Sequence, residues 1–348
     1  MAGRVTSVDV AARAGVSRSA VSRCFTPGAS IAPETRRKVT EAAKALGYRP
    51  NAIARSLIAG RSRMIAVVVG YMQNQFYPDL LDRLARELQA RGYHLLLFAA
   101  SPEGDSDALF PQILAYQADG IILASATLSS ALADECNAAG IPVVLINRTT
   151  DGTGVSSVTA DNVNGARAVA DFLLAGGHRR FAYVAGTAAS STNQDREAAF
   201  RGRLAEAGIG EVLREDGGYS QEGAAEAARR LLTRRDRPDA VFCANDHMAI
   251  AFMDAARHAL GLRIPQDVSV VGYDDVGPAR WPSYALTSVE QPVEAMVDIA
   301  ASALLDRIEG RETAARIARV PGALVVRESA RRPAAGIMTI DGRDVWTP

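Results

Sequence analysis

The spacing of hydrophobic positions changes once along the chain. Between residues 6 and 48, apolar side chains recur every three or four positions, which predicts short amphipathic helices. From Met64 onward, continuous apolar runs alternate with helix-length amphipathic stretches, a pattern typical of parallel strands buried on both faces. We therefore expect a small all-helical head and a larger α/β body of two lobes. The apolar runs are IAVVVG (65–70), HLLLFA (94–99), DGIILA (119–124), PVVLIN (142–147), FAYVAG (181–186), AVFCAN (240–245) and VSVVGY (268–273).

Two short helices separated by a tight turn open the head. Thr6 is placed as the N-cap of the first helix, with Asp9 as its capping-box partner. Gly15 suits the left-handed residue that ends a helix, and Ser17 suits the N-cap of the next helix. This spacing predicts a helix-turn-helix, and Pro33 suits the first turn of a third helix.

The helix after Ser17 has one polar and one apolar side. At 100° per residue, the polar side chains all fall on one arc and the apolar ones on the opposite arc. Arginine forms paired hydrogen bonds with guanine, and serine bonds bases or phosphates, so the polar arc suits the major groove of DNA. The alternative is an ordinary solvated face. The polar arc holds Arg18, Ser19, Ser22 and Arg23, and the apolar arc holds Ala20, Val21, Cys24 and Phe25.

Charge is distributed unevenly along the chain. The whole chain has no net charge, yet residues 1–63 hold twelve arginines and lysines against three acidic residues, a net charge of +9. The other residues must then carry a net charge of −9. A basic head on an acidic body indicates that the head contacts a polyanion, although a solvated basic face has the same composition.

The segment after the third helix has the features of a conditional helix. Pro50 resists a helix at the residue before it, and Asn51 suits the N-cap of about two helical turns over residues 52–59. An isolated helix this short is marginal in water, so we expect it to fold against a partner. Ile53 and Leu57 share one face of it. An inert linker is the alternative.

The segments TSVDVAARAGVSRSAVSRCF and APETRRKVTEAAKALGYRPNAIARSL resemble the DNA-binding head and hinge of the lactose-repressor (LacI/GalR) family. The resemblance continues over roughly residues 6–327. It implies an N-terminal all-α helix-turn-helix domain with a hinge helix, joined to a two-lobed α/β domain like the periplasmic binding proteins, with two doubly wound parallel sheets. Ala32 departs from the family, which usually has a capping serine there, and this substitution costs about 1 kcal/mol of capping.

The resemblance also implies domain boundaries. The tail has no clear periodicity and no assigned role, and it lacks the sustained heptads of a tetramerising coiled coil. The expected divisions are the helix-turn-helix domain (1–48), the hinge (49–62), the effector-binding and dimerisation domain (63–330) and the tail (331–348). Within the third division, one lobe is expected at about 63–161 and 292–320, and the other at about 162–291 and 321–330.

The implied DNA partner is a palindromic duplex operator bound by a homodimer or a tetramer, because a two-fold protein matches a two-fold site. Base contacts are expected to set sequence preference, and phosphate contacts to set register. In the family, a hinge leucine wedges into a base step and kinks the duplex, and Leu57 takes that position. Base contacts are assigned to Arg18, Ser19 and Arg23, phosphate contacts to Ser17, Ser22 and Asn51, and hinge contacts to Arg55 and Leu57.

Polar and aromatic residues lie at the ends of three predicted strands, in NQFYPDL (74–80), ANDHMAIAFMDA (244–255) and VVGYDD (270–275). Ligands of open α/β sheets bind at the carboxyl ends of strands. Aromatic faces with carboxylate, amide and guanidinium groups suit a hydroxyl-rich sugar, or a sugar acid held by an arginine. The positions that the resemblance implies are Asn74, Phe76, Tyr77, Asn147, Asp161, Arg196, Tyr219, Asn245 and Asp274, with Trp281 added from the following loop.

These effector positions have structural alternatives. Phe76 and Tyr77 also suit core packing, and Asn245 and Asp274 also suit helix caps or turns. The sequence leaves open whether the effector acts as an inducer or as a co-repressor.

The sequence lacks the motifs that are typical of enzymes. The nucleotide-binding, hydrolase and metalloprotease motifs GxGxxG, GxxxxGK[ST], GxSxG and HExxH are missing. The four histidines and three cysteines have no metal-ligand spacing, so we expect no metal, no cofactor and no enzyme. No signal-peptide core and no apolar run of ~20 residues is visible, which favours a cytoplasmic protein outside the membrane. Besides a regulator and an enzyme, a periplasmic sugar-binding protein is the third class considered, and such a protein would not carry a basic head.

Overall fold

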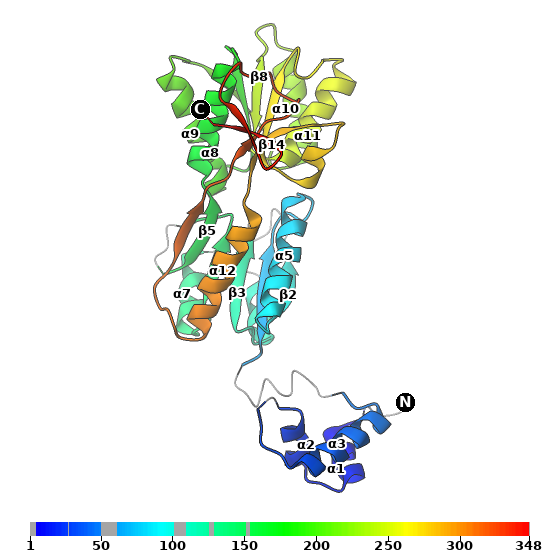
Figure 1. Ribbon diagram of the computed structural model, residues 1–348. Helices are drawn as coiled ribbons and strands as arrows, with labels where there is room; N and C mark the ends of the chain where they lie inside the picture. The colour runs from blue at the N-terminus through cyan, green and yellow to red at the C-terminus, as the bar shows by residue number, and fades with distance from the viewer. Residues whose placement is uncertain are drawn as a thin grey trace. The chain divides into compact units, whose positions relative to one another are not determined.

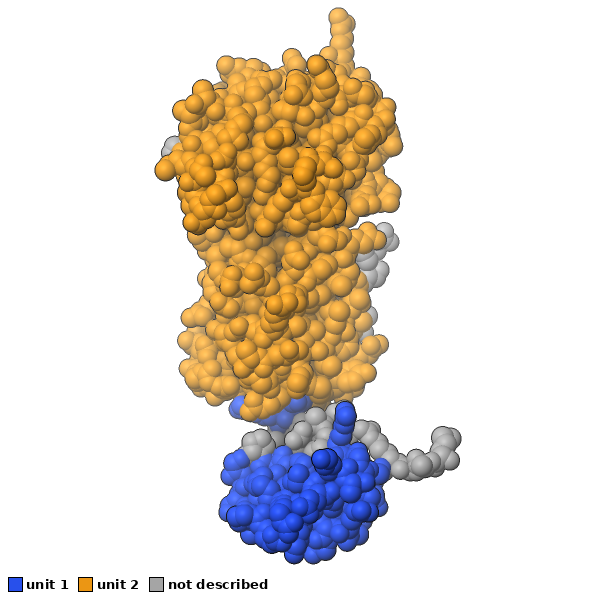
Figure 2. Space-filling model, turned by 45° about the vertical axis from the view of Figure 1, so that its right-hand side comes forward, with its two compact units in different colours: residues 1–62 blue, residues 63–348 orange. Residues whose placement is uncertain are grey.

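The computed structural model describes residues 5–26, 28–49, 61–100, 109–124, 129–150 and 154–347. The chain forms two compact units, the head (residues 1–62) and the body (residues 63–348), which Figure 2 colours blue and orange. In the described ranges, no helix is both long and apolar enough to cross a membrane.

The described residues of the head form three helices, namely α1 (Ser7–Ala14), α2 (Arg18–Cys24) and α3 (Pro33–Leu46) (Figure 1). Helices this short are marginal alone, so the core that they share stabilises them. The apolar stripes predicted from the sequence meet in this core. Its buried residues are Val10, Ala11, Val21, Cys24, Val39, Ala42 and Ala43.

The helix ends in the head follow the predicted capping. The Asp9 carboxylate accepts a hydrogen bond of 2.8 Å from the Thr6 backbone N–H, which holds the pKa of Asp9 below its ordinary value. Ser17 Oγ accepts from the Ala20 N–H at 3.2 Å at the start of α2. Ala32 gives α3 no side-chain cap, as its sequence predicts.

The first lobe of the body is a parallel sheet covered on both faces. Its strands are β1 (Met64–Val69), β2 (His94–Ala99), β3 (Gly120–Ala124), β4 (Val143–Ile146), β5 (Ser156–Ala160) and β11 (Ile317–Val320), and its helices are α5 (Phe76–Ala90), α6 (Phe110–Ala115), α7 (Ser130–Ala138) and α12 (Val293–Ile308). The strand order is β11-β5-β4-β3-β1-β2. Ile65 and Val67 of β1 pack with α5 and α12, whereas Ala66 and Val68 pack with α6 and α7. Burial on both faces explains the continuous apolar run.

The second lobe is a larger, mixed sheet. Its strands are β6 (Phe181–Ala185), β7 (Val212–Asp216), β8 (Ala240–Cys243), β9 (Ser269–Asp274), β10 (Thr287–Glu290), β12 (Leu324–Val325), β13 (Ile337–Ile340) and β14 (Arg343–Trp346), and its main helices are α8 (Asn162–Ala175), α9 (Ser191–Glu206), α10 (Gln221–Leu232) and α11 (Asp246–Asp254). The order is β13-β14-β12-β10-β9-β8-β6-β7. Figure 1 shows α8 and α9 on one side of this sheet and α10 and α11 on the other.

The chain passes between the two lobes three times, from β5 to α8, from β10 to α12 and from β11 to β12. Each lobe is therefore built from separate chain segments. The two-lobed α/β fold is confirmed. The second sheet differs from the expected all-parallel sheet because β12, β13 and β14 pair antiparallel at one edge.

The tail also differs from expectation, because it forms a docked hairpin. β13 and β14 are joined by Asp341 (φ 49°) and Gly342 (φ 73°), whose positive φ angles match the two-residue turn preferred by hairpins. Trp346 is buried and packs edge-on against Phe172 of α8, with ring centroids 5.6 Å apart. An Asp-Gly pair between apolar positions is a strong hairpin signal, so the sequence did contain this element.

Candidate DNA-binding surface and effector pocket

One side of α2 is exposed and basic, as the sequence predicts. Val21 and Cys24 face the core of the head. Among the described residues, neither Arg18 nor Arg23 forms an ion pair, whereas Arg37 of α3 bonds two glutamates at 2.8 and 3.0 Å. The α2 guanidinium groups therefore remain available to a polyanion. The exposed side chains are Ser17, Arg18, Ser19, Ser22 and Arg23.

The predicted hinge contacts Asn51, Arg55 and Leu57 lie outside the described residues. Their roles therefore stay predictions from sequence.

A polar pocket lies between the two lobes of the body. Its walls come mainly from segments that follow strands, where open α/β sheets place their ligands. The cavity measures about 10 Å³, the space of roughly one water molecule, so the side chains of the walls nearly fill it. The lining residues are Tyr71, Asn74, Tyr77, Asn147, Arg148, Thr192, Arg196, Tyr219, Asn245 and Asp274.

Arg196 of α9 is the buried cation of this pocket, with 2% of its surface exposed. Its Nε donates to Asn162 Oδ1 at 2.7 Å, and its guanidinium lies over the Tyr273 ring, 3.5 Å from the centroid. Its Nη1 lies 3.8 Å from Asp274 Oδ1. Within the described residues Nη2 has no hydrogen-bond partner. A buried donor without a partner costs free energy, so we infer that a ligand supplies the acceptor for Nη2.

Asp274, at the end of β9, is the buried anion of the pocket. Its Oδ2 accepts from Asn74 Nδ2 of the first lobe at 3.2 Å, and its Oδ1 accepts from Gln291 Nε2 at 2.7 Å. Burial raises the pKa of Asp274, and the Arg196 charge opposes that rise. The Asp274 carboxylate is thus held by two amide groups. Asn74 belongs to the first lobe, and Gln291 lies where the chain crosses from β10 to α12.

Several side chains close the cleft by direct contact between the lobes. Arg148 Nη1, which follows β4, donates to Thr192 Oγ1 of α9 at 2.9 Å. The rings of Tyr71 and Tyr219 meet edge to face at 5.7 Å. Gly186 makes room for this arrangement, because a Cβ there would overlap the Tyr219 ring.

Three pocket residues adopt backbone conformations that side-chain-bearing residues rarely take. Asn147 and Tyr219 each have φ of 59°, and Asp274 has φ of 120°. Such strained residues concentrate at binding sites, where surrounding structure holds them in place. Asn147 Nδ2 donates to the Tyr77 hydroxyl at 3.2 Å, while Asn147 Oδ1 has no partner among the described residues.

A second buried carboxylate lies behind the pocket. Asp246 accepts from Ser288 Oγ at 2.6 Å and from the Val276 N–H at 3.0 Å. Burial, and then the nearby Asp274 charge, raises the pKa of Asp246 to about 8. The neighbouring Asp275 instead pairs with Arg327 at 2.6 Å. Asp246 is therefore mostly protonated at neutral pH.

Three predicted effector residues do not line the pocket. Phe76 is a buried core residue that packs edge-on against Tyr77. Asp161 caps α8, accepting from the Asn164 N–H at 3.1 Å. Trp281 is 57% exposed on the surface of the second lobe. The other seven predicted residues do meet at the pocket.

Three lining residues were missed, namely Tyr71, Arg148 and Thr192. The first two carried a usable signal, because they follow strands directly, as the predicted residues do. Thr192 had none, since its position depends on how α9 meets the opposite lobe.

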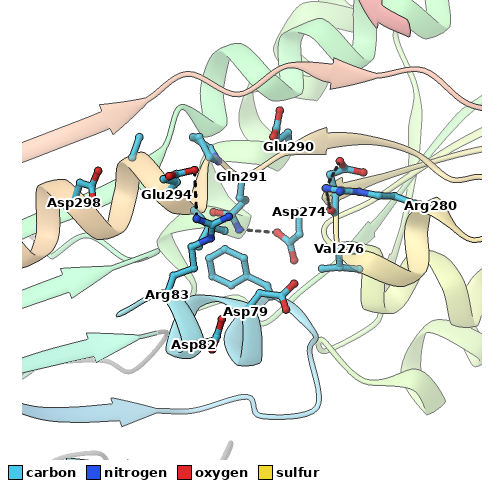
Figure 3. Close-up of a pocket in the computed structure, with 15 residues that line it drawn as sticks. Asp79, Asp82, Arg83, Asp274, Val276, Arg280, Glu290, Gln291, Glu294 and Asp298 are labelled. Carbon is cyan, nitrogen blue, oxygen red and sulfur yellow. Dashed lines mark hydrogen bonds and ion pairs between the residues drawn. The ribbon is translucent and has the colours of Figure 1, made fainter. Parts of the chain in front are cut away.

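A wider groove of about 800 Å³ lies beside the crossing from β10 to α12, as Figure 3 shows. Acidic side chains dominate its walls, and Arg83 of α5 reaches Glu294 of α12 at 3.3 Å. Asp274 lines both this groove and the pocket, so the two adjoin. Among the described residues, no group of three or more His, Cys, Asp or Glu is arranged to hold a metal ion.

The class of protein follows from these two features. A basic helix-turn-helix head, joined to a two-lobed body with a polar pocket between its lobes, defines a DNA-binding regulator controlled by a small molecule. Residues 7–51 match the model of the lacI family of bacterial regulatory proteins, and residues 170–330 match that of a periplasmic binding protein-like domain. The chain belongs to the LacI family of transcriptional regulators.

Relatives and solved structures agree with this assignment. The repressor PurR of Erwinia tasmaniensis is 34% identical over 93% of this chain and 96% of its own length, and the regulator CelR of Thermobifida fusca is 35% identical over 94% and 98%. The lac repressor dimer bound to operator and an anti-inducer superposes with a TM-score of 0.83, at 26% identity over 94% of this chain and 99% of that one. These relatives are transcriptional regulators rather than enzymes.

Proposed function

We propose that the protein is a cytoplasmic repressor that binds a palindromic operator as a homodimer. Its affinity for the operator falls or rises when a sugar or sugar acid binds in the cleft. The boundaries that we propose are 1–48 for DNA binding, 49–62 for the hinge and 63–330 for effector binding. The observation that carries the effector assignment is a pair of buried polar atoms of pocket residues, Arg196 Nη2 and Asn147 Oδ1, which have no hydrogen-bond partner within the part of the chain that the structure describes.

These two atoms specify complementary ligand groups. Arg196 Nη2 requires an acceptor and Asn147 Oδ1 requires a donor, and a hydroxyl group supplies either. Tyr71 and Tyr219 add aromatic surface for the C–H face of a sugar ring. A carboxylate on the ligand would also suit Arg196. The cellobiose complex of the regulator CelR, similar to this chain with a TM-score of 0.71 and 33% identity, supports a sugar as effector.

The cleft contacts give the effector a means of control. In the structure the lobes are already joined by Asn74–Asp274 and Arg148–Thr192. A ligand must take over some of these groups, so it shifts the spacing of the lobes only if it binds one state better. The hinge segments of a dimer would sense that shift.

A homodimer fits the exposed apolar residues of the first lobe. β2 is an edge strand without charged side chains, and Leu97 on it is 47% exposed. Tyr116, also in this lobe, is 57% exposed. The Tyr116 ring lies 6.0 Å from the ring of Phe98, the residue after Leu97 on β2, and contiguous apolar surface is typical of association sites.

The experiment combines a thermal-shift screen of sugars and sugar acids with operator binding by fluorescence anisotropy. A ligand at 100 times its dissociation constant adds about 2.7 kcal/mol of stability. The hit should change operator affinity in the wild type and not in Arg196→Ala. Arg201→Ala on the same helix, whose partner is Glu197, is the matched control and should respond as the wild type does. An effector response that survives in Arg196→Ala would show that the pocket is misplaced.

A further inference from the structure

The sheet of the second lobe ends in an edge strand without charged residues. Among the described residues, β13 pairs only with β14, and it is the last strand of the order. It contains no charged residue and no proline, and Met338 and Ile340 are 58% and 43% exposed. Soluble proteins usually keep an edge strand very short or protect it with a charge, a proline or a bulge, and the four residues of β13 include neither a charge nor a proline.

β13 differs in charge from two of the other three edge strands of the body. β7, at the opposite edge of the same sheet, carries Arg214, Glu215 and Asp216. β11, at one edge of the first sheet, carries Arg319. The remaining edge, β2, is uncharged and belongs to the surface proposed above for the homodimer. β13 is therefore a second uncharged edge, on the other lobe.

The hairpin register shows which backbone groups this edge offers. The two-residue turn makes Ile340 and Arg343 a hydrogen-bonded pair, and the Thr347 N–H donates to the Gly336 carbonyl at 2.8 Å. Because hydrogen bonding alternates along a strand, the N–H and C=O groups of Ile337 and Thr339 point away from β14. They form a short row of donors and acceptors at the free edge.

We propose that β13 pairs antiparallel with β13 of a second copy of this chain, about a two-fold axis at Met338. In this register Ile337 of each copy bonds Thr339 of the other, which gives about four backbone hydrogen bonds. The two Met338 side chains lie opposite each other on one face and cover apolar surface. A second copy is the occupant because the row is self-complementary under a two-fold rotation. Two homodimers joined in this way form a tetramer.

Disulfide trapping tests the register. Cys24, Cys136 and Cys243 are buried, so a thiol introduced on β13 is the reactive one among the described residues. Directly opposed residues in a pair without hydrogen bonds have Cβ atoms about 4.5–5.5 Å apart, close to disulfide geometry. Under a mild oxidant, which takes up the two electrons and two protons, Met338→Cys should link two chains at least ten times faster than Ile340→Cys. Equal rates, or no linkage of Met338→Cys, would overturn the proposal.

Sedimentation velocity of the full chain without DNA tests the assembly itself. Thr339→Pro removes the outward N–H while the backbone bonds to β14 remain, and Thr339→Val keeps that N–H as the matched control. Both variants lose the hydrogen bond from Thr339 Oγ1 to Asp344 Oδ1, so they differ in the outward N–H. The wild type and Thr339→Val should show a concentration-dependent species beyond the dimer, and Thr339→Pro should not. Identical distributions for the wild type and Thr339→Pro would refute the edge pairing. Operator binding per dimer should be the same in all three, so a failure of the proposed function would appear separately.

Discussion

Asp246 offers a quantitative test of the buried site, because its pKa changes between the unfolded and the folded chain. The ordinary value is 3.8, and in the folded body burial and the Asp274 charge raise the pKa to about 8. Between these two values the folded chain holds one proton more than the unfolded chain. The free energy of unfolding therefore falls as pH rises, by about 1.4 kcal/mol per pH unit.

Asp246→Asn removes this dependence. The asparagine amide oxygen still accepts from the Val276 N–H, and the amide does not titrate. Between pH 5.5 and 7.5 the variant should gain about 3 kcal/mol of stability relative to the wild type, because the slope of the wild type is lost.

Urea denaturation at several pH values measures this difference, provided that the body unfolds in a single transition. Asp298→Asn, which changes a carboxyl group at the surface of the first lobe, serves as the control and should run parallel to the wild type. A constant stability difference between Asp246→Asn and the wild type across this range would show that Asp246 is ionised in the folded state, and the reasoning would fail.

Two further predictions concern packing. Gly186→Ala should abolish the effector response while operator binding of the ligand-free protein persists, because the new Cβ displaces the Tyr219 ring; a normal response in anisotropy would contradict this. Trp346→Ala should lower the free energy of unfolding by about 3–5 kcal/mol, because the side chain fills the space beside Phe172; urea denaturation would measure it, and a loss below 1 kcal/mol would show that the hairpin is not docked.

The head was predictable because its information is local. The polar arc of α2 and the caps at Asp9 and Ser17 depend on residues within one or two helical turns. Strand ends likewise indicated Asn245 and Asp274 as pocket residues, since parallel strands present their carboxyl ends together.

The remaining features depend on contacts between distant segments. Asp161 directly follows β5, and Trp281 lies in the loop between β9 and β10, yet one caps a helix and the other faces solvent. The Arg148–Thr192 contact joins residues on opposite lobes, and no local pattern encodes it. The hairpin at Asp341–Gly342 is different, because its turn signal is local and is present in the sequence.

The exposed basic side of α2 is the feature on which the regulatory function rests most directly. Selection of bound duplexes from a random pool, followed by anisotropy on the selected and on a scrambled duplex, measures its role. The wild type should enrich a palindromic site, and Arg23→Ala should bind that site about 1–3 kcal/mol more weakly while binding the scrambled duplex almost unchanged. No enrichment by the wild type, or an equal loss on both duplexes, would contradict base contact by α2.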